Sequence, residues 1–159
     1  MIAVVQRVAN ASVDVAGERI GEIGCGLLVL LGVAKGDGLD AVEWIARKIV
    51  TLRVFADSDG KMNLDVRQCG GAVLLVSQFT LLADTSRGNR PGFERAEAPA
   101  AAERLCEQVA VALASYGVPV ARGRFGASME VRLLNDGPVT IVLDSAQMPG
   151  SKKEPAANS

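Results

Sequence analysis

The run Ala72-Val73-Leu74-Leu75-Val76-Ser77-Gln78-Phe79-Thr80-Leu81 decides the fold of this chain. It starts after two glycines as a continuous aliphatic stretch, and polar side chains begin abruptly at its carboxyl end. A short apolar run of this kind is typical of a strand covered on both faces. Ligands of open α/β sheets bind outside the carboxyl ends of such strands. The run therefore predicts a buried central strand and a position for a site.

Two amphipathic helices are predicted on either side of this run. Apolar residues recur at helical spacing from Asp40 to about Leu52, and Asp40 with Glu43 resembles a capping box at the helix start. The second helix is predicted to begin at Pro99 and to be stopped by Gly117.

The other periodic segments predict strands. Residues 1–33 are predicted to form strands, among them a return strand after a hairpin turn and a second buried apolar run. Three more strands are predicted after the second helix, and the last two are joined by a hairpin turn at Asn135-Asp136-Gly137. The ranges are Arg19–Ile23, Gly26–Val33, Val120–Phe125, Met129–Leu134 and Val139–Leu143. Because two helices cannot cover both faces of so many strands, the sequence predicts a single α/β domain over residues 1–146, with two helices on one side of the strands and strand packed on strand elsewhere. Residues 147–159 are predicted to be a disordered tail that contributes little to activity.

The composition excludes several kinds of site. The 159 residues contain no histidine, which rules out Ser-His-Asp and Cys-His catalysis and every His-containing zinc or iron site. Cys25, Cys69 and Cys106 are odd in number and have no CxxC spacing, which favours reduced thiols over a disulfide framework or zinc ribbon. No segment predicts a membrane span or a signal peptide, so we expect a cytoplasmic protein without membrane contact.

The net charge of the chain gives no overall positive field that would attract nucleic acid. The formal net charge is −1, which does not favour nonspecific duplex binding, and we expect no DNA partner. Arginines do cluster, at Arg87, Arg90 and Arg95 and again at Arg122, Arg124 and Arg132. From charge alone, these clusters fit a solvated face as well as a local grip on an RNA end. Residues 84–98 are long and polar enough to predict a functional loop.

Two segments are candidates for chemistry. Ser77-Gln78-Phe79-Thr80 either ends a strand by local hydrogen bonds or lines a site. A serine or threonine nucleophile there lacks a histidine base, although pairing with Lys35, Lys48 or Lys61 stays open. In the second segment, a proline follows Gly137, where it removes a ladder donor, and residue chemistry alone does not decide whether this bond is cis.

Taken together, the ordered segments closely resemble the D-aminoacyl-tRNA deacylase family, also called D-tyrosyl-tRNA deacylase. The segments that carry the resemblance are Met1–Val8 with its Gln6-Arg7 pair, Gly24–Gly32, Lys61–Leu64, Ser77–Leu81, Arg90-Pro91 and Asn135–Thr140. The resemblance spans about residues 1–145.

The resemblance implies a layered β/β/α domain and a cytoplasmic homodimer that needs no cofactor or metal. It implies hydrolysis of the ester between a D-amino acid, or mischarged glycine, and the tRNA 3′ end. Ser77, Gln78, Phe79 and Thr80 then line the pocket for the aminoacyl-adenosine, and a cis Gly137-Pro138 pair enters the partner subunit's pocket. Arg7 corresponds to the arginine that braces the Gly-Pro loop, and Phe125 and Met129 to residues near the terminal adenosine.

A histidine-free site is compatible with this chemistry. An aminoacyl ester is already activated, so positioning and oxyanion donors supply much of the modest acceleration required, and the backbone N–H groups around Phe79 and Thr80 are the candidate donors. Thr80 is therefore predicted to act mainly through its backbone. Rejection of L-amino acids is predicted to occur by steric exclusion. Two alternatives stay open: a module that binds tRNA ends without hydrolysis, and an editing domain like that of archaeal threonyl-tRNA synthetases, which removes L-serine.

Overall fold

The computed structural model describes residues 1–150, and residues 151–159 of the predicted tail lie outside the described part. Within residues 1–150 the elements follow the order strands, helix, strands, helix, strands. They are β1 (Ile2–Val15), β2 (Glu18–Ile23), β3 (Gly26–Gly32), α1 (Leu39–Thr51), β4 (Phe55–Ala56), β5 (Met62–Leu64), β6 (Ala72–Ser77), a 3-10 helix (Phe79–Leu82), α2 (Pro99–Ser115), β7 (Val120–Arg122), β8 (Glu130–Asp144) and a second 3-10 turn (Ser145–Gln147).

One sheet organises the domain. Its hydrogen-bonded order is β2-β1-β3-β6-β7, and β8 pairs with the other edge of β1. β6 is parallel to both β3 and β7, whereas β1 is antiparallel to all of its partners. The two predicted apolar runs, which form β3 and β6, are therefore central strands of the sheet, as predicted. Gly26 shows how closely β3 and β6 approach, because a Cβ built on it would lie 1.9 Å from the carbonyl oxygen of Ala72.

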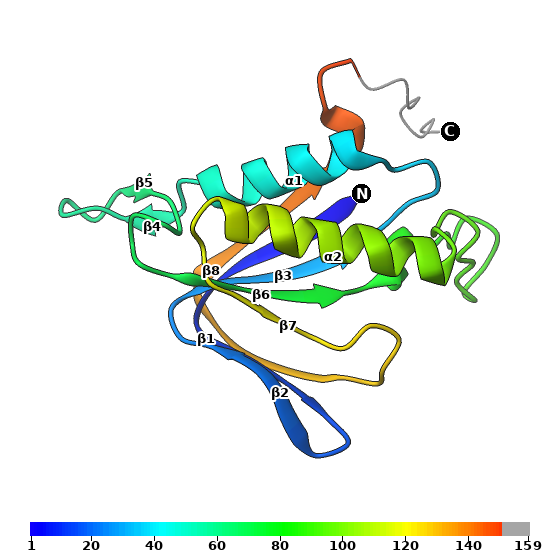
Figure 1. Cartoon of the computed structure of the whole chain (residues 1–159), viewed down its shortest axis with the longest axis horizontal. Helices are drawn as coiled ribbons and strands as arrows, with labels where there is room; N and C mark the ends of the chain where they lie inside the picture. Colours follow the sequence, from blue (N-terminus) through cyan, green and yellow to red (C-terminus); the bar gives the residue numbers. More distant parts are fainter. Residues whose placement is uncertain (151–159) are drawn as a thin grey trace.

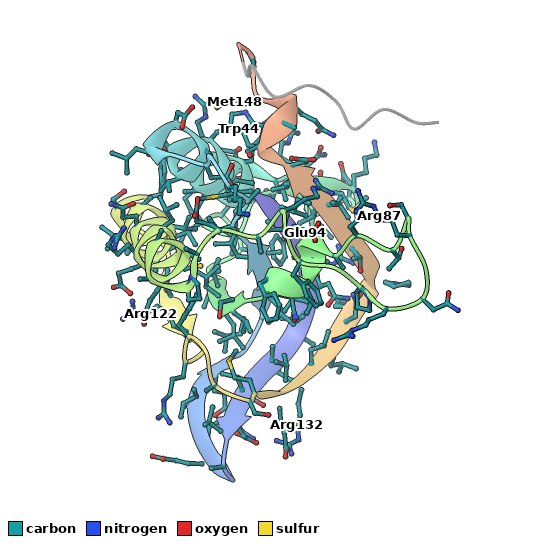
Figure 2. The ribbon with its side chains drawn as sticks, turned by 90° about the vertical axis from the view of Figure 1, so that its right-hand side faces the viewer. Trp44, Arg87, Glu94, Arg122, Arg132 and Met148 are labelled. Atoms are coloured by element: carbon teal, nitrogen blue, oxygen red, sulfur yellow. The ribbon has the colours of Figure 1, made fainter. Side chains whose placement is uncertain are left out.

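The predicted layers are confirmed. Both α-helices cover the same face of the sheet (Figure 1), and their buried faces pack on the alternate side chains of β1, β3 and β6 to form the larger core. The long strands β1 and β8 curve away from the helices toward the end where Arg132 lies (Figure 2). The second half of β1 pairs with β2, which contacts β6 and β7 across the layer. A second core, containing Val13, Leu28 and Leu74, fills that space.

The predicted hairpin after Leu134 is wrong. Residues 130–144 form one continuous strand that pairs with β1, and its register shifts between the pairs Gln6↔Thr140 and Val8↔Asn135. Arg7 alone on β1 therefore faces residues 136–139 on β8, which form a bulge. The local Asp-Gly signal is that of a hairpin turn, but the long uninterrupted partner strand keeps both halves of β8 on the same edge.

Smaller differences have local causes. α1 has Gly38 at its N-cap and no side-chain cap, so the predicted capping box is wrong. Glu43 instead accepts a hydrogen bond from the hydroxyl of Tyr116 on α2. The ordered part of the chain also extends past residue 146, because the half-buried Met148 packs against the larger core.

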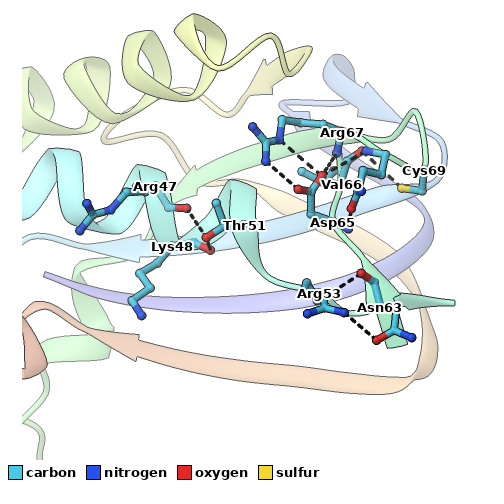
Figure 3. A network of polar contacts seen from close by, with 10 residues as sticks. Arg47, Lys48, Thr51, Arg53, Asn63, Asp65, Val66, Arg67 and Cys69 are labelled. Carbon is cyan, nitrogen blue, oxygen red and sulfur yellow. Dashed lines mark hydrogen bonds and ion pairs between the residues drawn. The ribbon is translucent and has the colours of Figure 1, made fainter. Parts of the chain in front are cut away.

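Polar contacts hold the segment between α1 and β6 (Figure 3). Arg53 donates from Nε to the backbone oxygen of Asn63 at 2.9 Å and from Nη2 to its side-chain oxygen at 2.8 Å. Asp65 accepts from Arg67 at 2.6 Å and from the backbone N–H of Gln68 at 3.1 Å. These contacts fix the backbone on both sides of the β4–β5 hairpin, next to Val54.

Candidate active site

The carboxyl end of β6 turns directly into a 3-10 helix. Ser77 is the last strand residue and pairs with Leu31, and the backbone N–H of Gln78 donates to the oxygen of Leu31 at 2.8 Å. Within residues 1–150, the backbone N–H groups of Phe79 and Thr80 donate no hydrogen bond. Unpaired N–H groups at the start of a helix attract negative charge. This turn therefore presents two unpaired N–H donors, a suitable place for an anionic group.

A cavity of about 430 Å³ opens beside this turn. Among its lining residues are five of the predicted site residues: Ser77, Gln78, Phe79, Phe125 and Met129. The sheet brings them together because β7, which precedes Phe125, is the parallel neighbour of β6, while Met129 directly precedes β8. Much of the remaining lining is apolar, including Leu31 and Val76 from the strands and Ala102 from α2.

Thr80 lies outside the lining of this cavity. Its hydroxyl accepts a hydrogen bond from the side-chain amide of Gln78, and its side chain is exposed. None of Lys35, Lys48 and Lys61 lines this cavity, so it offers no lysine base to Ser77. The arrangement favours a backbone role for Thr80.

The predicted functional loop packs against the site. The ring of Phe93 meets that of Phe79 edge-on, with centroids 4.9 Å apart. Residues 95–97 are fastened to the end of β3, where Lys35 N–H donates to the oxygen of Arg95 and Glu97 N–H donates to that of Val33, both at 2.9 Å. Phe79 itself remains 57% exposed, so its ring forms an accessible rim.

Two lining residues with ionisable side chains were not predicted from the sequence. Glu97 lines the cavity from the end of the loop, with its carboxylate accepting from the backbone N–H groups of Gly36 and Ala98, and Cys106 lines it from α2. Burial raises the pKa of the Cys106 thiol to about 11, and nearby Glu103 contributes in the same direction. The thiol is therefore protonated near neutral pH and is a poor nucleophile. Its helical spacing in the sequence indicates only a core face.

Gly137 and Pro138 lie away from this cavity, in the exposed bulge of β8. The bond between them is cis. Arg7 donates from Nε to the backbone oxygen of Asp136 at 2.8 Å and from Nη1 to that of Val54. Asn135 closes the bulge, since its side-chain oxygen accepts from Val139 N–H at 2.9 Å. The structure thus places Arg7 beside the Gly-Pro pair, and places this group apart from the cavity of its own chain.

The strand that carries the bulge is exposed along one edge. β8 pairs only with β1 among the strands of residues 1–150. Two apolar side chains flank the bulge on this strand: Leu134 is 58% exposed and Val142 is 62% exposed. Large exposed apolar groups on an unpaired edge strand are typical of an interface with another chain.

Comparison with known proteins places the chain in a family and agrees with the fold. The family model described as D-Tyr-tRNA(Tyr) deacylase matches residues 4–144 of this chain. The chain belongs to this family. A D-aminoacyl-tRNA deacylase of Cereibacter sphaeroides is 59% identical over 145 residues, covering 91% of this chain and 100% of that protein. The protein of the same name in Alteromonas mediterranea is 55% identical, covering 89% of this chain and 97% of its own length.

Solved structures match this member of the deacylase family over the same region. One titled c-Myc DNA unwinding element binding protein superposes with a TM-score of 0.87 at 44% identity, covering 91% of this chain and 99% of that one. Another, titled a probable eukaryotic D-amino acid tRNA deacylase, has a TM-score of 0.75 at 15% identity, covering 89% and 97%. The second match supports the fold alone.

Residues 1–150 contain neither a metal-binding cluster of side chains nor a membrane-spanning helix. No group of three or more His, Cys, Asp or Glu side chains is placed to hold a metal ion. No helix in this part of the chain is both long and apolar enough to cross a membrane.

Proposed function

We propose that this deacylase-family chain hydrolyses the ester that joins a D-amino acid to the 3′-terminal adenosine of tRNA. The observation that carries the proposal is the turn after Ser77: Ser77, Gln78 and Phe79 line the cavity, and the N–H groups of Phe79 and Thr80 have no acceptor within residues 1–150. Water adds to the ester carbonyl, the two N–H groups stabilise the oxyanion, and the C–O bond to the ribose then breaks. The products are the free D-amino acid and tRNA with its ribose hydroxyl restored.

The cavity supplies binding and orientation rather than a nucleophile. An aminoacyl ester is an activated acyl group, so holding it in place with a water molecule supplies much of the acceleration. The adjacent 2′-hydroxyl of the tRNA assists proton transfer. Phe125 and Met129 offer apolar surface to the terminal adenosine, because single-stranded bases stack readily on such side chains. Binding of the single-stranded 3′ end alone in this way is compatible with a net charge of −1.

Selection for D-amino acids arises from a second copy of the chain. Gly137 and Pro138 project from an edge strand, outside the cavity of their own chain and between exposed Leu134 and Val142. In a homodimer this bulge enters the partner's cavity, where its backbone carbonyls hold the substrate ammonium group. A side chain in the L configuration then clashes with the bulge, whereas a D side chain points away from it. Glycine has no side chain to clash and is also hydrolysed.

Release of free amino acid distinguishes hydrolysis from the alternative function, a module that binds tRNA ends without cleaving the ester. Purified protein is incubated with D-tyrosyl-tRNA labelled in the amino acid, and acid-soluble label is followed with time. Multiple turnovers support the proposal, and binding without release contradicts it. L-seryl-tRNA in a parallel reaction tests the threonyl-tRNA synthetase editing alternative, which predicts release of serine. The cytoplasmic location and the expected lack of a DNA partner stay predictions.

A further inference from the structure

A second cavity adjoins the first. It has a volume of about 590 Å³ and lies between α2 and the segment from β7 to Phe125. It shares Ser77, Cys106 and Phe125 with the lining of the candidate active site. A chain-like ligand that fills the first cavity therefore lies next to the second, with Phe125 in the wall of both.

The second cavity is polar and carries both signs of charge. Arg122 and Arg124 line it from the β7 side, and Glu103 and Glu107 from α2. Arg122 is already paired with Glu107, and Figure 2 shows it beside the helix. The exposed side chains of Arg124 and Glu103, by contrast, make no hydrogen bond or ion pair with any other residue in the range 1–150. An unpartnered cation and an unpartnered carboxylate in one cavity fit a ligand that has both an anionic group and a hydrogen-bond donor.

We infer that this cavity binds the cytidine that precedes the terminal adenosine at the tRNA 3′ end, an inference that rests on the proposed function. Every tRNA ends in single-stranded C-C-A, so the nucleotide next to the adenosine is a cytidine joined through a phosphate. The phosphate is the anionic group, and an arginine guanidinium matches its geometry. The N4 amino group of cytosine is the donor, which a carboxylate accepts.

In this arrangement Arg124 binds the phosphate and Glu103 accepts from cytosine N4. Phe125, which lines both cavities, stands between the two bases, where an aromatic ring provides a stacking surface. The Arg122–Glu107 pair holds α2 against β7 and leaves the other two side chains available. Proteins commonly recognise single-stranded RNA bases by stacking on the base face and by hydrogen bonds to the exposed base edges.

The first experiment compares two substrates of different length. Arg124→Gln is assayed with D-tyrosyl-tRNA and with D-tyrosyl-adenosine, which lacks the cytidine. We expect kcat/KM on the tRNA to fall about tenfold, mainly through KM, as for loss of one charge-assisted hydrogen bond. Activity on the adenosine ester should be unchanged. The slope of log(kcat/KM) for the tRNA against log salt concentration should become shallower by about 0.7, the change expected for loss of one phosphate contact to a single strand. The control is Arg104→Gln, an exposed arginine on α2 that lines neither cavity.

The second experiment tests the base. A D-tyrosyl-tRNA whose penultimate cytidine is replaced by uridine presents a carbonyl oxygen where cytosine has its amino group. The wild type should prefer the cytidine form by about tenfold, and Glu103→Ala should lose this preference.

The outcomes separate this inference from the proposed function. The inference is overturned if Arg124→Gln leaves tRNA turnover unchanged, weakens both substrates equally, or matches Arg104→Gln. It is also overturned if the wild type does not distinguish cytidine from uridine. Failure of the wild type to hydrolyse either D-tyrosyl ester would instead contradict the proposed function.

Discussion

Arg7 Nε lies 2.8 Å from the backbone oxygen of Asp136, the residue that precedes the Gly137-Pro138 pair. The same guanidinium donates to the backbone oxygen of Val54, in the segment that follows α1. One half-buried side chain therefore ties the bulge of β8 to the helical layer. A bidentate anchor of this kind depends on the planar fork of arginine, which lysine does not reproduce.

Replacing Arg7 should loosen the bulge without unfolding the protein. We expect both Arg7→Lys and Arg7→Ala to lower D-tyrosyl-tRNA turnover by about 10- to 100-fold, because each loses the paired contacts to Asp136 and Val54. Activity on L-tyrosyl-tRNA should rise relative to the D substrate. Single-turnover assays with both substrates measure this effect, and thermal unfolding serves as the control for folding. An unchanged D-to-L ratio in Arg7→Ala would show that the brace has no part in selection.

Thr80 should contribute through its backbone. Its hydroxyl already accepts from the amide of Gln78, and no lysine or histidine lies in the cavity lining to activate it. Thr80→Val, which keeps the shape of the side chain, and Thr80→Ala should both retain activity within about tenfold of the wild type. Steady-state kinetics provide the measurement. A loss near 10⁴-fold with the fold intact, the scale at which damage to a catalytic triad acts, would assign the hydroxyl a chemical role.

Gly137 is a position where any side chain forces a change. Its φ is +145°, and a Cβ built there would lie 2.7 Å from the backbone nitrogen of Val139 and 3.1 Å from Arg7 Nη2. Gly137→Ala should therefore displace the bulge and lower D-tyrosyl-tRNA turnover. Because residues 136–139 have no pairing partner on β1 and residues 136–138 are exposed, the melting temperature should change little.

Mixed subunits test whether the bulge serves the partner. Gly137→Ala protein and a second protein altered in the cavity, Phe125→Ala, are each expected to be weakly active. When they are mixed and allowed to exchange, a heterodimer contains one site with both an intact cavity and an intact bulge. Activity should then recover to as much as half of that of the wild type in such dimers. Absence of recovery, with subunit exchange shown by mass spectrometry, would place bulge and cavity function in the same chain.

Acid should remove a stabilising contribution of Asp14. Hydrogen bonding to Arg19, helped by the charges of Arg19 and Arg132, lowers the pKa of this carboxyl in the folded protein. Its contribution is therefore complete above the unfolded value of about 4 and is lost as the pH falls below it. Asp14→Asn should reduce the urea midpoint at pH 7, and the difference from the wild type should shrink below about pH 4. A difference that stays constant down to pH 3 would exclude this linkage.

The central layers were predictable because they follow from local patterns. Two aliphatic runs gave β3 and β6, helical spacing gave α1 and α2, and the polar end of β6 marked the turn that lines the cavity. The bulge at Gly137 was not predictable from local patterns, because its Asp-Gly sequence is also typical of a hairpin turn. Only the pairing of β8 with the whole of β1 distinguishes a bulge from a hairpin here. Glu97 and Cys106 were missed for a similar reason, since long-range packing alone brings them into the cavity.

The end of the domain shows the same limit of local patterns. Residues from 147 onward are mostly polar, so no periodicity marks Met148, yet its side chain packs on the larger core. A single apolar residue after the last strand gains a packing partner only from the tertiary fold. Truncation before Met148 therefore removes a core contact that the sequence pattern does not reveal.

The rate of deacylation of D-tyrosyl-tRNA, compared with that of L-tyrosyl-tRNA under identical conditions, tests the central claim most directly. Purified full-length protein at catalytic concentration is mixed with each substrate, and ester remaining is measured over time against the spontaneous hydrolysis of each. The account predicts rapid, multiple-turnover loss of the D ester while the L ester decays at its spontaneous rate. Equal hydrolysis of both esters, or protection of the D ester without turnover, would contradict it.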